Sequence, residues 1–253
     1  MNFLALDFDG VISDSIQECL VVGNNAWYAY SHHGRPVTRI EELPEKIIDN
    51  AKRIRNYIRS GEDYVYIFMA LDQDIEINNQ NDFDAFTESY EGLRKIFFEI
   101  FYRNRKEFLQ NHKEQWIALN PLYDGMQKFL QNFPAQNLFV ISTKKSSYIR
   151  QILQANHITR IDDHLFHAGT ENPKAEIIEQ LLKKHHIDKE SFYFVDDQVD
   201  TLIKCQPTGV HCVLAKWGYN TEEQIEKAKQ QDIAVMDLFL FYQQFNAIGF
   251  FKL

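Results

Sequence analysis

Leu4-Ala5-Leu6-Asp7-Phe8-Asp9-Gly10-Val11 places two carboxylates directly after a short apolar run. The run has the continuous apolar character of a strand that is buried on both faces, and it stops at Asp7. Ligands bind at the carboxyl ends of strands in open α/β sheets. Gly10 relaxes the turn that follows, so Asp7 and Asp9 can reach one site. Two acids at a strand end are also typical of a turn capped by an aspartate, and the pair alone does not decide between the two interpretations.

Three later apolar runs have the same character, at residues 138–141, 192–195 and 210–214. Each is followed by polar residues and then by a helical pattern. Alternation of strands and helices predicts an α/β fold with a doubly wound, parallel, Rossmann-like core sheet. After the last run, Thr221 with Gln224 predicts a capping box that opens a helix around Ile225.

Residues 15–120 differ from this pattern, because they are rich in helix formers and aromatic residues. Their apolar residues recur at spacings of three and four, which indicates amphipathic helices. The segment leaves the sheet after the first strand and returns before the second, as an inserted helical cap would. We therefore expect a core of residues 1–14 and 121–253 and a cap of residues 15–120. Within the cap, the acidic, Asn-rich stretch 73–84 predicts a loop.

Charge and composition narrow the classes of partner. The chain has 253 residues, 45% of them hydrophobic, and a formal net charge of −9, which disfavours nucleic acid and anionic membrane as partners. Its three cysteines (Cys19, Cys205 and Cys212) lack the CxxC spacing of a zinc site. They indicate a reducing compartment. No apolar segment approaches the length of a membrane span, and no leader-like segment precedes Asp7, so we expect a cytoplasmic protein.

Two further segments carry groups suited to binding phosphate. Ser142 and Thr143 follow the second apolar run, where hydroxyls and the N–H groups of a helix start can bind phosphate oxygens, although hydroxyls also cap helices widely. Asn172, Pro173 and Lys174 predict the N-cap, N1 and N2 positions of a helix that continues through residue 182. A lysine there opposes the helix dipole unless an anion lies nearby. The alternative is a solvated surface lysine.

The fourth feature is the run at residues 192–195, which ends in Asp196 and Asp197. Adjacent carboxylates at the end of a buried strand supply oxygen ligands for a hard cation. They can also simply cap a turn. The sequence leaves open whether Asp196 or Asp197 is the direct metal ligand.

The stretch Asp7-Phe8-Asp9-Gly10-Val11-Ile12-Ser13-Asp14-Ser15 resembles the first signature of the haloacid dehalogenase-like hydrolases, in the phosphoglycolate phosphatase-like branch with a helical cap. The other three features match later signatures of that family in the same order. The resemblance implies that Asp7 is the nucleophile and Asp9 the general acid/base. It implies that the phosphate is held by Gly10, Ser142, Thr143 and Lys174, and Mg²⁺ by Asp7, the Asp9 carbonyl and Asp196.

The activity that the resemblance implies is Mg²⁺-dependent hydrolysis of a small phosphate monoester through an aspartyl-phosphate. A phosphomutase with the same core, or a non-catalytic binding or regulatory protein on this fold, remains an alternative. A nucleotide-binding oxidoreductase is disfavoured because no GxGxxG follows the first strand. The sequence names neither the substrate nor the oligomeric state.

Two smaller expectations concern charged residues. Asp14 with Gln17 predicts a cap for the helix that follows the first strand. The basic cluster of Lys52, Arg53, Arg55 and Arg59 is typical of a solvated helix face, with reception of an anionic substrate as the alternative.

Overall fold

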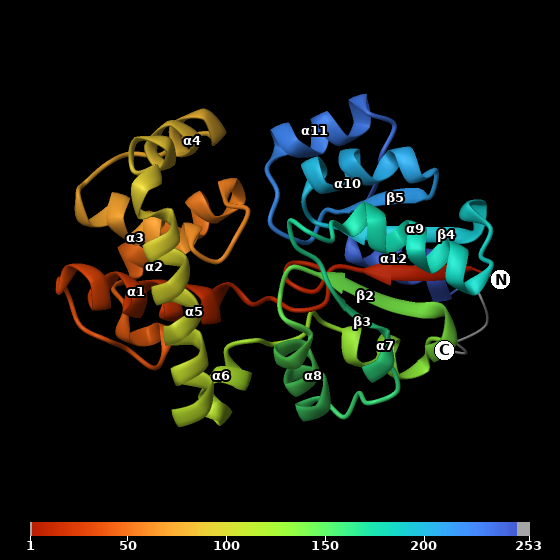
Figure 1. Ribbon diagram of the computed structural model, residues 1–253, viewed down its shortest axis with the longest axis horizontal. Coiled ribbons are helices and arrows are strands. Elements are labelled where there is room, and N and C mark those ends of the chain that lie inside the picture. Colours follow the sequence, from red (N-terminus) through yellow and green to blue (C-terminus); the bar gives the residue numbers. More distant parts are fainter. Residues whose placement is uncertain (1, 247–253) are drawn as a thin grey trace. The chain divides into compact units, whose positions relative to one another are not determined.

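The structure, a computed structural model, describes residues 2–246. The chain divides into two compact units, drawn in Figure 1 in colours that follow the sequence. One contains residues 2–14 and 122–246, and the other contains residues 15–121. Each unit has its own buried core.

The first unit is built on a six-stranded, wholly parallel sheet with the order β3-β2-β1-β4-β5-β6. The strands are β1 (Phe3–Leu6), β2 (Leu138–Ser142), β3 (Leu165–His167), β4 (Phe192–Asp196), β5 (His211–Ala215) and β6 (Ala234–Met236). Leu6 of β1 lies opposite Val140 of β2 and Val195 of β4. Because the strands are parallel, their carboxyl ends meet at one edge of the sheet, and β1 lies between two neighbours there.

The predicted doubly wound α/β fold is confirmed. Helices alternate with the strands: α7 (Met126–Asn132), α8 (Ser146–Ala155), α9 (Lys174–His185), α10 (Val199–Cys205), α11 (Glu222–Gln230) and α12 (Leu238–Asn246). The capping box of Thr221 and Gln224 opens α11 as predicted, one residue before Glu222. Strands β3 and β6 were not predicted because each has only three residues, too few for a strand pattern to be recognised, even though Ala234–Met236 of β6 are all apolar.

The second unit is helical. It contains α1 (Ile16–Ser31), α2 (Glu45–Ile54), α3 (Asp63–Asp72), α4 (Gln80–Ser89), α5 (Arg94–Asn111) and α6 (Lys113–Ala118). The predicted loop over residues 73–84 is wrong beyond residue 79, because Asn79 accepts a hydrogen bond from the Asp82 N–H and so starts α4. No helix within residues 2–246 is both long and apolar enough to span a bilayer.

Two predictions about charged residues are also wrong. Asp14 does not cap α1, because the N-cap of that helix is Ser15. The Asp14 carboxylate instead accepts a hydrogen bond of 2.6 Å from the Tyr219 hydroxyl. In the basic cluster, Arg55 is buried rather than solvated, with its guanidinium 5.8 Å from the centre of the Tyr64 ring. Stacking on an aromatic face compensates part of its desolvation, which the pattern of charges alone does not reveal.

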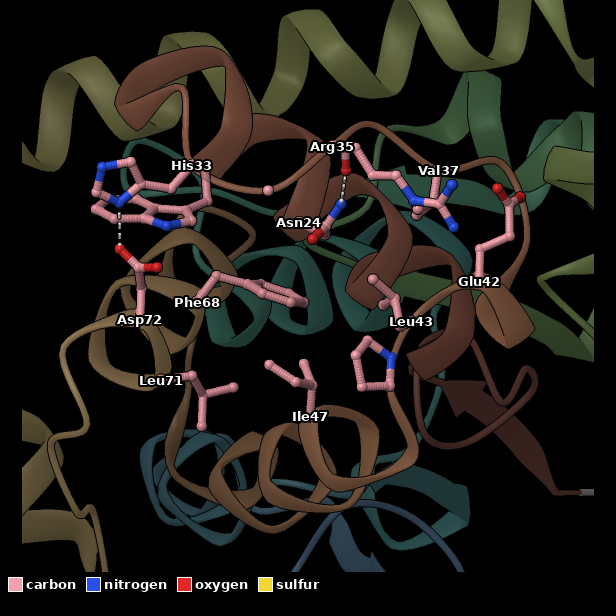
Figure 2. Close-up of a pocket in the computed structure, with 13 residues that line it drawn as sticks. Asn24, His33, Arg35, Val37, Glu42, Leu43, Ile47, Phe68, Leu71 and Asp72 are labelled. Atoms are coloured by element: carbon pink, nitrogen blue, oxygen red, sulfur yellow. Dashed lines mark hydrogen bonds and ion pairs between the residues drawn. The ribbon is translucent and has the colours of Figure 1, made fainter.

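A buried polar network holds the helical unit together. Glu18 is fully buried and accepts two hydrogen bonds of 2.9 Å from Arg105 and one of 3.0 Å from Trp116 Nε1. These contacts join α1, α5 and α6. The other tryptophan of this unit, Trp27, has no hydrogen-bond partner for Nε1 among the described residues. It lines a cavity of about 390 Å³, around which Figure 2 shows Leu43, Ile47, Phe68 and Leu71.

The different surroundings of the two indole N–H groups predict different effects of their loss on stability. Trp116→Phe should lower the free energy of unfolding by about 1–3 kcal/mol, because a buried carboxylate loses a hydrogen-bond donor. Trp27→Phe is the matched control: it removes an indole N–H that has no partner in the described structure, and should cost less than Trp116→Phe. Urea denaturation of both variants measures the difference. Equal losses would show that the bond to Glu18 contributes nothing specific.

Candidate active site

Three carboxylates meet at the carboxyl edge of the sheet. Asp7 directly follows β1, and its N–H donates a 2.9 Å hydrogen bond to the Val195 carbonyl of β4, which brings it beside Asp196. One oxygen each of Asp7, Asp196 and Asp197 lies within 4.8 Å of the others. All three side chains are buried. Carboxylate oxygens this close together can share one cation.

Lys174 links two of these acids. Its Nζ lies 2.8 Å from Asp7 Oδ1 and 2.7 Å from Asp196 Oδ2. Lys174 is the first residue of α9 and Pro173 is its N-cap, so the predicted helix start was one residue too early and Asn172 does not cap it. Burial alone would lower the pKa of Lys174, but the charges of Asp196 and Asp7 raise it above its ordinary range. The lysine is therefore a fixed positive charge in the site.

Asp7 ionises less readily than an ordinary aspartate. Burial raises its pKa from 3.8 to about 6, against the opposing effect of Lys174 and with further increases from Asp196 and Asp9. A carboxylate in such surroundings gains from any added positive charge.

Asp9 has a partner that the sequence did not reveal. Lys144 Nζ lies 2.9 Å from Asp9 Oδ1, and the lysine side chain is inaccessible to solvent. The lysine stands two residues after Ser142, at the end of the strand next to β1. Its sequence signal was slight: a cation in the turn after a buried strand, where a surface residue is the usual occupant.

The turn after β1 depends on Gly10, which has a φ of +85°. A Cβ built there would lie 2.2 Å from Asp197 Oδ2, so an alanine would both strain the backbone and clash with the acid. Asp197 Oδ2 also accepts a 3.0 Å hydrogen bond from the Tyr219 N–H. Asp197 is thus packed against the turn, whereas Asp196 accepts hydrogen bonds from Lys174 and from the Gln198 N–H.

The two candidate hydroxyls differ in position. Ser142 is buried, and its Oγ accepts a 3.2 Å hydrogen bond from the Lys144 N–H. Thr143 is exposed to solvent. Asp200, in α10, is not among the three clustered acids and pairs with Lys227 at 2.8 Å, with both side chains partly exposed.

The donor set suits a hard divalent cation. It consists of carboxylate oxygens alone, from Asp7, Asp196 and Asp197, and Mg²⁺ prefers such ligands at about 2.1 Å. The positive charge of Lys174 does not balance these three acids. The residues present therefore fit a magnesium ion.

Comparison with protein families finds a match. The model for the family described as "Haloacid dehalogenase-like hydrolase" matches residues 47–215, which is more than half of the chain. This range includes Ser142, Lys174 and Asp196 but begins after Asp7 and Asp9. No curated protein sequence matches the chain.

Solved structures share the fold at low identity. A predicted phosphatase from Clostridium acetobutylicum is 12% identical, with a TM-score of 0.60 and coverage of 96% of this chain and 97% of that one. A haloacid dehalogenase-like hydrolase from Streptococcus pneumoniae is 16% identical, with a TM-score of 0.60 and coverage of 96% and 98%. A predicted phosphoglycolate phosphatase from Haemophilus somnus is 19% identical, with a TM-score of 0.58 and coverage of 94% of both chains. At these identities the likeness is one of fold.

Proposed function

Because the chain belongs to the haloacid dehalogenase-like hydrolase family, we propose that it is a Mg²⁺-dependent phosphatase of small phosphate monoesters that forms a phosphorylated Asp7. The observation that carries the proposal is the placement of Lys174 Nζ 2.8 Å from Asp7 and 2.7 Å from Asp196. Hydrolysis of a phosphate dianion needs positive charge next to the attacking carboxylate, since two anions repel one another. Structural neighbours described as predicted phosphatases support the same activity.

The proposed reaction has two steps. A carboxylate oxygen of Asp7 attacks phosphorus, its new O–P bond forms as the bond to the leaving oxygen breaks, and Asp9 donates a proton to that oxygen. Asp9 then takes a proton from a water molecule, which attacks phosphorus and releases inorganic phosphate and free Asp7. Lys174, Ser142, Thr143 and the N–H groups of the turn at Gly10 hold the remaining phosphoryl oxygens.

The metal would be held by Asp7, the backbone carbonyl of Asp9, and Asp196. When bound, it supplies positive charge that offsets the charge of the phosphoryl group. Asp197 offers an oxygen to the same cluster and is the alternative to Asp196.

We also propose roles for the two parts of the chain. Residues 1–14 and 121–253 are the catalytic core, and residues 15–120 form a cap that excludes bulk water and selects the substrate. A cytoplasmic location accords with three buried cysteines that form no disulfide.

We expect the dependence of activity on Mg²⁺ to change when the buried Asp196 is replaced. Asp196→Asn should raise the Mg²⁺ concentration for half-maximal activity by at least about tenfold, because it removes a ligand charge from the cluster. Asp200→Asn is the control, since Asp200 pairs with Lys227 on the surface, and it should change this value little. A Mg²⁺ titration of both variants and of Asp197→Asn decides the assignment. A larger effect of Asp197→Asn would make Asp197 the ligand.

The activity itself is tested with 4-nitrophenyl phosphate, with Mg²⁺ or with EDTA. The proposal expects multiple turnovers that stop when EDTA removes the metal. A phosphomutase would release little phosphate and would instead convert a sugar phosphate to its isomer. A non-catalytic protein would show no turnover with a panel of phosphate monoesters, and that result would sink the proposal.

A further inference from the structure

We propose that Lys144 is a positioning residue for Asp9: it holds the Asp9 carboxylate in the place from which Asp9 gives and takes the proton. This inference rests on the proposed function. It concerns a residue outside the set of acids, hydroxyls, glycine and lysine that the family resemblance identified.

The contact is direct and buried on the lysine side. Lys144 Nζ lies 2.9 Å from Asp9 Oδ1, the lysine side chain has no solvent exposure, and the Asp9 side chain keeps 22% of its exposure. An ammonium removed from water is costly unless an opposite charge pairs with it. The lysine therefore favours the arrangement in which Asp9 stays beside it, while the exposed part of Asp9 can still meet a substrate.

The lysine is held at its backbone and near its ammonium group. Its N–H donates a 3.2 Å hydrogen bond to Ser142 Oγ, at the end of β2. Its Nζ lies 5.8 Å from the centre of the ring of Phe8, the residue before Asp9. Because β2 pairs directly with β1, the side chain reaches from one strand end to the turn of its neighbour. Such a support limits the rotamers open to Asp9.

The two lysines contact different residues of the proposed mechanism. Lys174 contacts Asp7 and Asp196, at 2.8 and 2.7 Å, whereas Lys144 contacts Asp9, at 2.9 Å. In the proposed mechanism the first pair belongs to the nucleophile and the metal, and the second to proton transfer. Loss of Lys144 should therefore affect proton transfer and leave the affinity for Mg²⁺ nearly unchanged.

The experiment compares two esters that differ in their need for a proton. Phenyl phosphate has a poor leaving group and depends on Asp9, whereas 4-nitrophenyl phosphate has a good one and depends on it less. Lys144→Met should lower kcat/KM, which reports the first step, for phenyl phosphate by about 10- to 100-fold, less than the full contribution of general acid catalysis because Asp9 itself remains, and should lower it several-fold less for the nitrophenyl ester. Lys145→Met is the matched control: Lys145 is adjacent and exposed, and its loss should change neither rate by more than about twofold.

A double-mutant cycle separates positioning of Asp9 from other roles. With Asp9→Asn already present, Lys144→Met should cause little further loss, since the two residues act together. Lys144→Arg keeps the charge and should recover part of the phenyl phosphate rate, and it serves in place of Lys144→Met if circular dichroism shows that the latter does not fold. A Mg²⁺ titration of the variant should give the half-maximal concentration of the wild type.

The outcomes are distinguishable. Wild-type protein that hydrolyses neither ester overturns the proposed function and this inference with it. Wild-type turnover together with an equal loss for both esters, or with losses that multiply in the Asp9→Asn background, leaves the phosphatase intact and overturns the role of Lys144 alone.

Discussion

Asp7→Asn is expected to reduce turnover of 4-nitrophenyl phosphate by about 10⁴-fold or more while the protein stays folded. Asparagine keeps the size and most of the hydrogen-bonding capacity of the side chain, but it lacks the anionic oxygen that the first step consumes. Loss of a nucleophile in such an assembly costs far more than loss of one binding contact. Steady-state turnover, with circular dichroism to verify folding, measures the effect.

The matched control is Asp9→Asn. This variant loses proton transfer by Asp9 but keeps the nucleophile. The rate of the first step should therefore fall less for the nitrophenyl ester than for esters with poor leaving groups. If folded Asp7→Asn kept activity near the wild-type level, Asp7 would not be the nucleophile.

Asp7→Asn should also change how the free energy of unfolding depends on pH. The pKa of Asp7 is raised from 3.8 to about 6 in the folded protein, chiefly by burial. Between these values the folded state binds more protons than the unfolded state, so the metal-free protein loses stability as pH rises through this window. The loss is at most about 3 kcal/mol, at about 1.4 kcal/mol per pKa unit. Asp7→Asn should remove this slope, and urea unfolding in EDTA across about pH 3 to 7 measures it.

The second large effect is expected for Lys174→Met in the metal-free protein. The change removes the ammonium that Asp7 and Asp196 share, and it leaves two carboxylates that are almost fully buried. Breaking a buried pair in this way costs about 3–5 kcal/mol of unfolding free energy. Protonation of Asp7, whose pKa is already raised, reduces the loss at low pH.

Lys183→Met supplies the control on the same helix, because Lys183 is exposed and should tolerate the change within about 0.5 kcal/mol. Mg²⁺ should restore part of the stability of Lys174→Met, since a ligand that binds only the folded state stabilises it. Urea unfolding of both variants with and without Mg²⁺ tests this. Equal stability of the two variants in EDTA would contradict the role given to Lys174.

The sequence predicted the fold well where burial is continuous. The strands at residues 3–6, 138–142, 192–196 and 211–215 all have the long apolar runs that mark central strands of a parallel sheet. The edge strands β3 and β6 have three residues each, which is too short for an apolar run or a period to be recognised in the sequence.

The sequence indicated which residue types of the candidate site stand at which strand ends. It did not indicate which side chains contact one another. Parallel pairing of β1 with β4 puts Asp7 beside Asp196, which the order of the acids allowed us to expect. The pairing of Asp9 with Lys144 joins residues 135 positions apart, and nothing in the local pattern marks that lysine as buried. The burial of Arg55 was not predicted for the same reason, because tertiary packing determines that its guanidinium lies over the Tyr64 ring.

The most direct test of the account is to trap the phosphorylated residue. The Asp9→Asn variant, in which hydrolysis of the intermediate should be slow, is mixed with 4-nitrophenyl phosphate and Mg²⁺, quenched in acid and reduced with borohydride, which converts an aspartyl-phosphate to homoserine. Peptide mass spectrometry should then find homoserine at position 7, in an amount that matches the nitrophenolate released in the first turnover. Release of nitrophenolate with unmodified Asp7, or with homoserine at another aspartate, would contradict the assignment of Asp7 as the nucleophile.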